Sequence, residues 1–133
     1  MNPMKKTGIL LFAHGARDPA WAKPFEAVAH VLKQRAQGQE IRLAFLEFMS
    51  PNIMEAGLDL IDQGCNHITV VPLFLGAGGH VRKDLPRLID ELKAKNPEVT
   101  WTLSPAVGET DILIQALADA AWALAQPDTA GQG

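Results

Sequence analysis

The chain has 133 residues, of which 47% are hydrophobic and 20% are charged, and its net charge is −3. These values are typical of a globular protein with one self-sufficient core, so we expect a single domain over residues 1–126 and a disordered tail at 127–133. The acidic excess argues against nucleic acid as the main partner, because a phosphate-binding surface normally carries a basic excess.

The N-terminal segment superficially resembles a signal peptide, because Lys5 and Lys6 precede a short apolar run. That run is too short and too soon interrupted by His14 and Arg17 to be a secretory or membrane-spanning segment. We therefore expect a cytoplasmic protein. Cys65 is the only cysteine, which excludes an internal disulfide and a CxxC-type metal site. We expect it to be a buried free thiol.

Short apolar runs alternate along the chain with segments of helical periodicity. The runs cover residues 8–13, 41–48, 67–75 and 99–103, and each is typical of a buried strand. Apolar residues at helical spacing follow each run, around residues 25–32, 53–61, 85–92 and 113–124. Strict alternation implies right-handed crossovers, a parallel sheet and helices on both faces. We therefore predict a three-layer α/β/α fold with a flavodoxin-like, four-stranded parallel sheet.

Turn-forming residues separate these elements. Asp18-Pro19 and Ser50-Pro51 each place a capping side chain before a proline that suits a first helical turn. Gly38 and Gly64 fit the ends of the first two helices.

Polar side chains follow the first three strands. His14 follows the first, Glu47 lies at the end of the second and His80 follows the third. Because open parallel sheets bind ligands outside the carboxyl ends of their strands, we expect these residues to share one edge. Two imidazoles and a carboxylate suit borderline divalent metals such as cobalt, nickel, iron or zinc. His14 and His80 are the predicted metal ligands, and His14 and Glu47 the predicted proton acceptors.

The other two histidines serve as internal controls. His67 opens the third strand and should lie at the opposite edge of the sheet, and His30 lies within the first helix. For both we expect a structural or surface role. Glu47 stands in the apolar sequence "AFLEFM", so it is either a buried functional carboxylate or one that turns outward at the strand end.

A glycine-rich turn carries the third strand into the next helix. Gly76, Gly78 and Gly79 stand in "GAGGHV", but Val81 breaks a GxGxxG pattern and no GK[ST] follows. We therefore predict no nucleotide cofactor. The glycines are typical either of a backbone that approaches a large flat ligand closely or of a flexible connection.

Three cations accompany the histidines: Arg17, Arg82 and Lys83. Each alone is typical of a solvated surface. Together they suit a ligand rich in carboxylates.

The segments "AHGARDP", "AFLEFMSP" and "VVPLFLGAGGHVRKDLP" resemble those of the sirohydrochlorin chelatases of the short CbiX type. The resemblance extends from about Ile9 to the fourth helix. It implies insertion of a divalent metal, usually cobalt and in related members nickel or iron, into sirohydrochlorin for cobalamin synthesis. Ala16 departs from the pattern, since many relatives have serine there.

The resemblance also implies roles for individual residues. His14 corresponds to the family's metal ligand and proton acceptor, His80 to its second metal-binding histidine and Glu47 to an acidic active-site position. The loop that contacts the tetrapyrrole corresponds to Phe74, Leu75, Gly76, Ala77, Gly78 and Gly79. Longer relatives contain two copies of the unit around one cleft, so this chain is expected to form a homodimer.

Two other functions fit the residues. A histidine followed by glycine and arginine is typical of phosphohistidine enzymes, although Ala13 stands where their RHG motif has arginine. A metal carrier or sensor would bind cobalt or nickel through both histidines and never metallate a tetrapyrrole.

Overall fold

The structure is a computed structural model that describes residues 5–76 and 78–127, without the side chains of residues 79–82. Ala77 and most of the predicted tail at 127–133 lie outside the described residues. None of the described helices is long and apolar enough to cross a membrane.

Four parallel strands form one sheet, as predicted, and their order is β2-β1-β3-β4. They are β1 (Thr7–Ala13), β2 (Glu40–Phe45), β3 (His67–Pro72) and β4 (Thr100–Leu103). β1 lies between β2 and β3, so the chain passes from β1 to its neighbour on one side and then to its neighbour on the other. The loops after β1 and β3 therefore diverge, and ligands of open α/β sheets bind at such a switch point.

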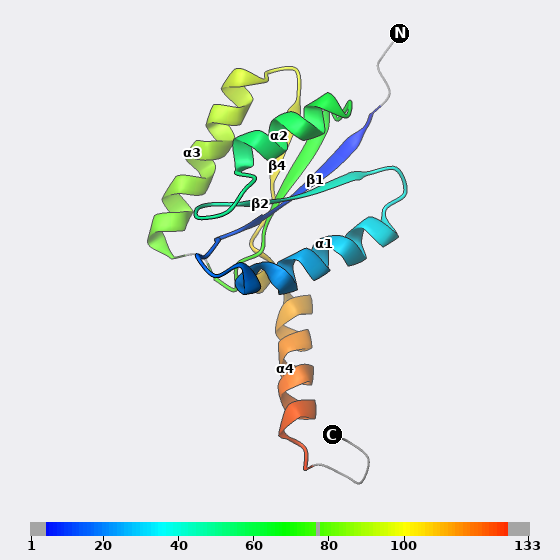
Figure 1. Cartoon of the computed structure of the whole chain (residues 1–133), viewed down its shortest axis with the longest axis vertical. Helices are drawn as coiled ribbons and strands as arrows, with labels where there is room; N and C mark the ends of the chain where they lie inside the picture. Colours follow the sequence, from blue (N-terminus) through cyan, green and yellow to red (C-terminus); the bar gives the residue numbers. More distant parts are fainter. Residues whose placement is uncertain (1–4, 77, 128–133) are drawn as a thin grey trace.

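The helices lie on both faces of the sheet (Figure 1). The 3-10 turn η1 (Pro19–Ala22) leads into α1 (Lys23–Arg35) on one face, and α2 (Ile53–Asp62) and α3 (Gly79–Lys95) cover the other. The 3-10 turn η2 (Val107–Glu109) leads into α4 (Asp111–Ala125), which points away from the sheet (Figure 1). The fourth predicted helix thus forms, but it covers neither face.

The main core lies between the sheet and the α2–α3 layer. Leu10 and Val70 are fully buried there, and Phe12 from β1 and Leu60 from α2 pack in the same cluster. A smaller cluster lies under α1. Burial of these side chains is the main free-energy gain of the fold, at about 1.5–3 kcal/mol for each large one.

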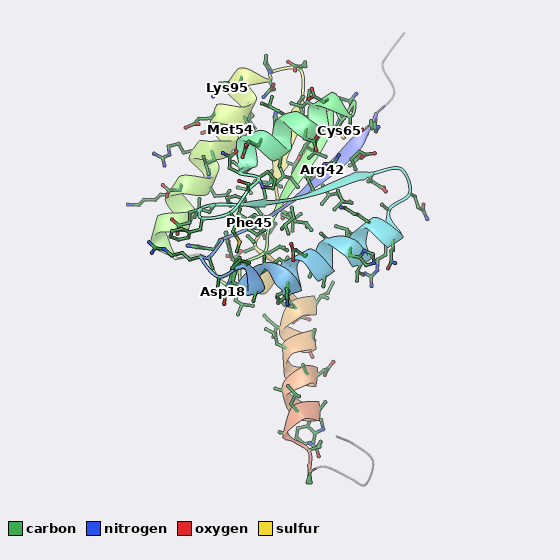
Figure 2. The ribbon with its side chains drawn as sticks, viewed as in Figure 1. Asp18, Arg42, Phe45, Met54, Cys65 and Lys95 are labelled. Atoms are coloured by element: carbon green, nitrogen blue, oxygen red, sulfur yellow. The ribbon has the colours of Figure 1, made fainter. Side chains whose placement is uncertain are left out.

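Cys65 is a buried free thiol, as predicted. Removal from water raises the pKa of the Cys65 thiol, so the unreactive protonated form predominates at neutral pH. Figure 2 shows it at the opposite end of the sheet from Asp18, which follows β1.

Two strands end earlier than predicted. β2 ends at Phe45 rather than residue 48, and β3 ends at Pro72 rather than residue 75. The Leu46 and Leu73 amides still donate to carbonyls of β1, but the chain then bends away from the ladder. Glu47 consequently lies in a bend beyond β2, not within the strand.

The two predicted helix starts differ in outcome. Asp18 is a cap as predicted, since its Oδ1 accepts from the Ala20 amide at 2.9 Å, although the turn that it begins is η1. Ser50-Pro51 does not begin α2. Asn52 caps that helix instead, in a capping box in which Asn52 and Glu55 each accept a hydrogen bond from the other's amide.

The capping box predicts a difference between two neighbouring substitutions. We expect Asn52→Ala to lower the free energy of unfolding by about 1 kcal/mol, because the Glu55 amide loses its acceptor. Ser50→Ala should change it by less than about 0.5 kcal/mol, since Ser50 is exposed. Urea unfolding followed by circular dichroism measures both, and an equal loss in the two variants would restore Ser50 as the cap.

Candidate functional site

His14 and Glu47 meet at the carboxyl edge of the sheet, as their positions after β1 and β2 predict. The distance from His14 Nε2 to Glu47 Oε1 is 3.1 Å, and the two side chains are 46% and 49% exposed. Of the two alternatives for Glu47, the structure has the outward-turned one. A carboxylate and an imidazole that are accessible to solvent and already within hydrogen-bond distance can exchange protons or approach a cation together.

The backbone after β1 fixes this pair. The Leu46 amide donates to the Ala13 carbonyl at 2.9 Å, and the Glu47 amide donates to the His14 carbonyl at 3.1 Å. Gly15 has a φ of +94°, and a Cβ at this position would collide with the Glu47 carbonyl. The close approach of the two loops therefore requires glycine at position 15.

Phe74 supports the imidazole from the side of β3. Its ring packs edge-on against His14 at a centroid distance of 6.4 Å and against Phe12 at 6.1 Å. Phe74 is 8% exposed. It is therefore a core residue beneath His14, and its contact with a tetrapyrrole stays a prediction.

The loop after Phe74 is anchored at its beginning, and its described residues 75, 76 and 78 are exposed. The Gly108 amide of η2 donates to the Phe74 carbonyl at 2.9 Å. Leu75 is 70% exposed. A Cβ at Gly76 or Gly78 would have no described atom within 4 Å. This open space is compatible with a ligand that approaches the backbone.

The remaining predicted residues of this segment lie at the start of α3. Gly78 is the N-cap residue of α3, and Gly79 begins the helix. His80 lies in its first turn with Arg82, but both side chains lie outside the described part of the structure. Lys83 is exposed. The second predicted metal ligand is thus placed by its backbone alone.

Arg17 has a partner that the sequence analysis missed. Its guanidinium carbon lies 5.0 Å from the ring centroid of Phe48, within the range of a cation–π contact. Phe48 is 58% exposed and has a φ of +66°, an uncommon conformation for a bulky residue. The only sequence signal for it was an aromatic residue directly after Glu47.

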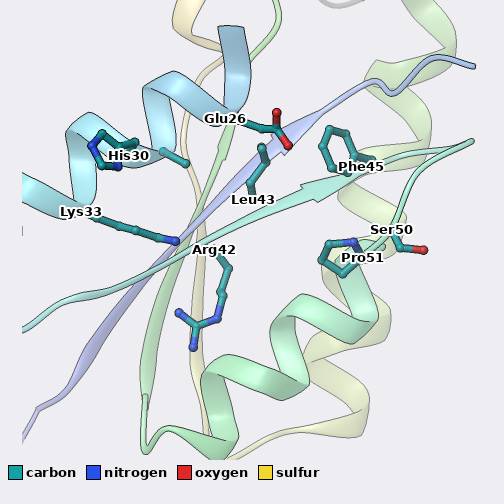
Figure 3. A pocket seen from close by; sticks show the side chains of 9 residues that line it. Glu26, His30, Lys33, Arg42, Leu43, Phe45, Ser50 and Pro51 are labelled. Atoms are coloured by element: carbon teal, nitrogen blue, oxygen red, sulfur yellow. The ribbon is translucent and has the colours of Figure 1, made fainter. Parts of the chain in front are cut away.

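The two control histidines lie elsewhere, as predicted. His67 begins β3 at the amino edge, where its Nδ1 lies 2.9 Å from Asn66 Oδ1. His30 is exposed on α1 and lines an open groove of about 460 Å³ between α1 and β2 (Figure 3). Arg42 in that groove is already paired with Asp59 and Glu40. The groove is lined by neither His14 nor Glu47.

Among the described side chains, no group of three His, Cys, Asp or Glu residues is close enough to hold a metal ion. His14 and Glu47 present two side chains of a type that binds metal ions. A third protein ligand would come from a residue whose side chain is not described, such as His80, or from another molecule. Such an incomplete set favours a cation that is held briefly and passed on.

Known proteins are similar to this chain over nearly its whole length. The CbiX family model matches residues 8–122. A sirohydrochlorin cobaltochelatase of Saccharolobus solfataricus is 34% identical over 107 residues, which cover 76% of this chain and 82% of the relative. Another, of Sulfurisphaera tokodaii, is 35% identical over 86 residues, or 65% of this chain and 70% of the relative.

Solved structures agree with the sequence matches. A protein described as a cobalamin (vitamin B12) biosynthesis CbiX protein, from Marinobacter aquaeolei, has a TM-score of 0.80 at 33% identity and covers 89% of this chain and 96% of its own. The sirohydrochlorin chelatase SirB of Bacillus subtilis, in complex with cobalt, has a TM-score of 0.79 at 25% identity. The match covers 90% of this chain and 51% of SirB. The chain therefore belongs to the CbiX family.

Proposed function

We propose that this protein is a sirohydrochlorin chelatase that inserts a divalent metal ion, cobalt in the first instance and nickel or iron as alternatives, into the tetrapyrrole. The observation that carries the proposal is the accessible His14–Glu47 pair at the switch-point edge of a CbiX chain. Curated relatives are named sirohydrochlorin cobaltochelatases, which supports both the substrate and the metal.

The proposed reaction exchanges two protons for one cation. The two inner N–H groups of the macrocycle lose their protons while the metal loses bound water and forms bonds to the ring nitrogens. His14 is the proposed ligand and proton acceptor, since its Nε2 lies at the exposed edge beside Glu47. Glu47 accepts the proton from His14 or directly from the ring, and His80 is the second proposed metal ligand. The proton acceptors must be neutral His14 and ionised Glu47 for this to proceed.

Other residues at this edge suit the body and the periphery of the substrate. Leu75, Gly76 and Gly78 are exposed, so the ring can approach the backbone there. Arg17, Arg82 and Lys83 are the proposed partners of the peripheral carboxylates, with Arg17 held over Phe48. Phe74 acts beneath His14 and supports its ring.

A homodimer of this chain is part of the proposal. The chain corresponds to about half of SirB, since the match covers 51% of that chain. One copy contributes a single open edge with two described ligands, and a second copy would close the site from the other side of the macrocycle. We also propose that residues 1–126 act as one chelatase domain. Its setting would be the cytoplasm, which suits the free thiol of Cys65.

Metallation can be followed directly by absorbance, because metal binding changes the spectrum of the tetrapyrrole. Purified protein is mixed with sirohydrochlorin and Co²⁺, Ni²⁺ or Fe²⁺ in separate assays, with the uncatalysed reaction as reference. We expect acceleration with at least one metal. Metal binding without any acceleration would identify a carrier or sensor instead. Phosphoryl transfer to His14 without metallation would identify a phosphohistidine enzyme.

A further inference from the structure

Helix α4 exposes apolar surface that the rest of the described chain does not cover. Its contacts within the fold are mainly with the preceding turn η2, and it points away from the sheet (Figure 1). Ile114 is 50% exposed, Leu117 is 49% exposed and Leu124 is 86% exposed. A helix of 15 residues is marginally stable in water on its own, and an apolar patch of this kind marks an interaction surface.

Six apolar residues of α4 form a stripe along one side of the helix, while the exposed Ile112 and Trp122 lie outside it. They recur three or four residues apart, as on a helix that packs by one face. We call this the α4 stripe, and its members are Leu113, Ile114, Leu117, Ala120, Ala121 and Leu124. Asp111, Gln115 and Asp119 lie outside the stripe. The helix therefore carries a packing face that no described residue of its own domain covers.

An apolar groove on α1 has the complementary properties. It has a volume of about 330 Å³ and is lined by Ala27, Val28, Val31, Leu32 and Arg35. Val28 is 46% exposed and Val31 is 43% exposed. The opposite flank of α1, with Glu26, His30 and Lys33, faces β2 (Figure 3). The apolar groove therefore lies on the flank of α1 away from β2, where Leu32 packs in one cluster with Val71 of β3.

The neighbouring half of the sheet is also uncovered on this face. α1 contacts mainly β2, while Thr69 and Val71 of β3 are only half-buried and Thr102 of β4 is exposed. In a doubly wound domain this is the place of a second helix beside α1. The two helices are of similar length, since α1 has 13 residues and α4 has 15. The groove has one charged residue, the cation Arg35, and the segment from η2 through α4 carries only acidic charges.

We propose that α4 docks its stripe into the α1 groove of a second copy of this chain, and that the partner's α4 docks reciprocally. Both surfaces belong to one chain and both are unfilled, so a two-fold axis satisfies each of them twice. α4 begins at the carboxyl edge of its own sheet, where Gly108 is bonded to Phe74. Docking along the partner's α1 then brings the two carboxyl edges together, with one His14–Glu47 pair from each copy. The inference rests on the homodimer of the proposed function and specifies which surfaces form it.

Cross-linking between single-cysteine variants tests this exchange. Leu117→Cys and Val31→Cys lie near the middle of their helices, so they approach each other in the proposed docking. Equal amounts of the two variants are mixed, treated with a short bismaleimide and separated on a denaturing gel. We expect a covalent heterodimer, and native Cys65 is buried and remains unmodified. Gln115→Cys replaces Leu117→Cys as the matched control, and we expect at least about 10-fold less product because position 115 lies outside the stripe.

A chain that carries both cysteines distinguishes exchange from folding back. Cross-linking mainly within one chain would show that α4 returns to its own α1 and would overturn the proposal. A dimer in sedimentation that gives no heterodimer product would also overturn it, while leaving the chelatase function intact if metallation persists. Loss of metallation with the cross-link intact would count against the function alone.

A pair of charged variants provides an independent measurement. Leu117→Glu should raise the dimer dissociation constant by at least about 10-fold, because a carboxylate is then buried in an apolar contact in both copies. Gln115→Glu adds the same charge outside the stripe and should leave the constant unchanged. Sedimentation velocity over a concentration series measures both. Equal constants for the two variants would overturn the docking, and circular dichroism confirms that α4 still forms.

Discussion

Replacement of His14 by alanine is expected to lower the rate of sirohydrochlorin metallation by about 100-fold or more, the effect typical of a lost proton acceptor. The imidazole would also be lost as a metal ligand. Folding should be unaffected, because the His14 side chain is 46% exposed and its polar contact is with Glu47 alone among the described residues. The measurement is the initial rate of the absorbance change with Co²⁺ at saturating sirohydrochlorin.

His67→Ala is the matched control for that experiment. It removes the same side chain at the amino edge of the sheet, where His67 contacts Asn66. We expect wild-type metallation in the folded protein. His80→Ala should reduce the rate as His14→Ala does, because His80 lies in the first turn of α3 at the carboxyl edge. Equal losses in His67→Ala and His14→Ala would contradict the assignment of the site to this edge.

Gly15→Ala is expected to be the most destabilising substitution near the site, with a loss of about 3 kcal/mol in the free energy of unfolding. Two effects combine. An alanine at a φ of +94° is strained, and its Cβ collides with the Glu47 carbonyl. Relief of that collision must move the bend that carries Glu47 away from His14. Metallation should therefore fall even where the variant is fully folded.

Gly38→Ala separates the two effects. Gly38 has a φ of +98°, but a Cβ there has no atom within 4 Å. Backbone strain alone should lower the free energy of unfolding by about 1 kcal/mol and leave metallation unchanged. Urea unfolding and the metallation assay are performed on both variants. Similar losses in the free energy of unfolding of the two variants would show that the collision with the Glu47 carbonyl does not contribute to the effect of Gly15→Ala.

The pattern of apolar residues does not predict where β2 and β3 end. Apolar runs extend to residues 48 and 75 in the sequence, but β2 and β3 end at Phe45 and Pro72. An apolar residue such as Phe74 is buried equally well in a strand or in the loop that follows it. The end of a strand depends on where its backbone hydrogen bonds stop, and that is decided by neighbouring segments such as η2.

The first residue of a helix is likewise not determined by the local sequence alone. Ser50-Pro51 and Asn52 are both acceptable starts in sequence, and only Asn52 has an acceptor placed for the amide three residues later. The sequence also does not predict the Arg17–Phe48 contact, because the two residues lie in different loops far apart in the chain.

The sequence by itself determined the parallel α/β fold and the edge at which His14 and Glu47 meet. Alternating strands and helices permit few topologies, and parallel crossovers bring every carboxyl strand end to one side. The tertiary structure alone decided the 3.1 Å contact between the two side chains, the burial of Phe74 and the exposure of α4. Those properties depend on contacts between residues far apart in the chain, and a local pattern such as the α4 stripe specifies an apolar face without specifying what covers it.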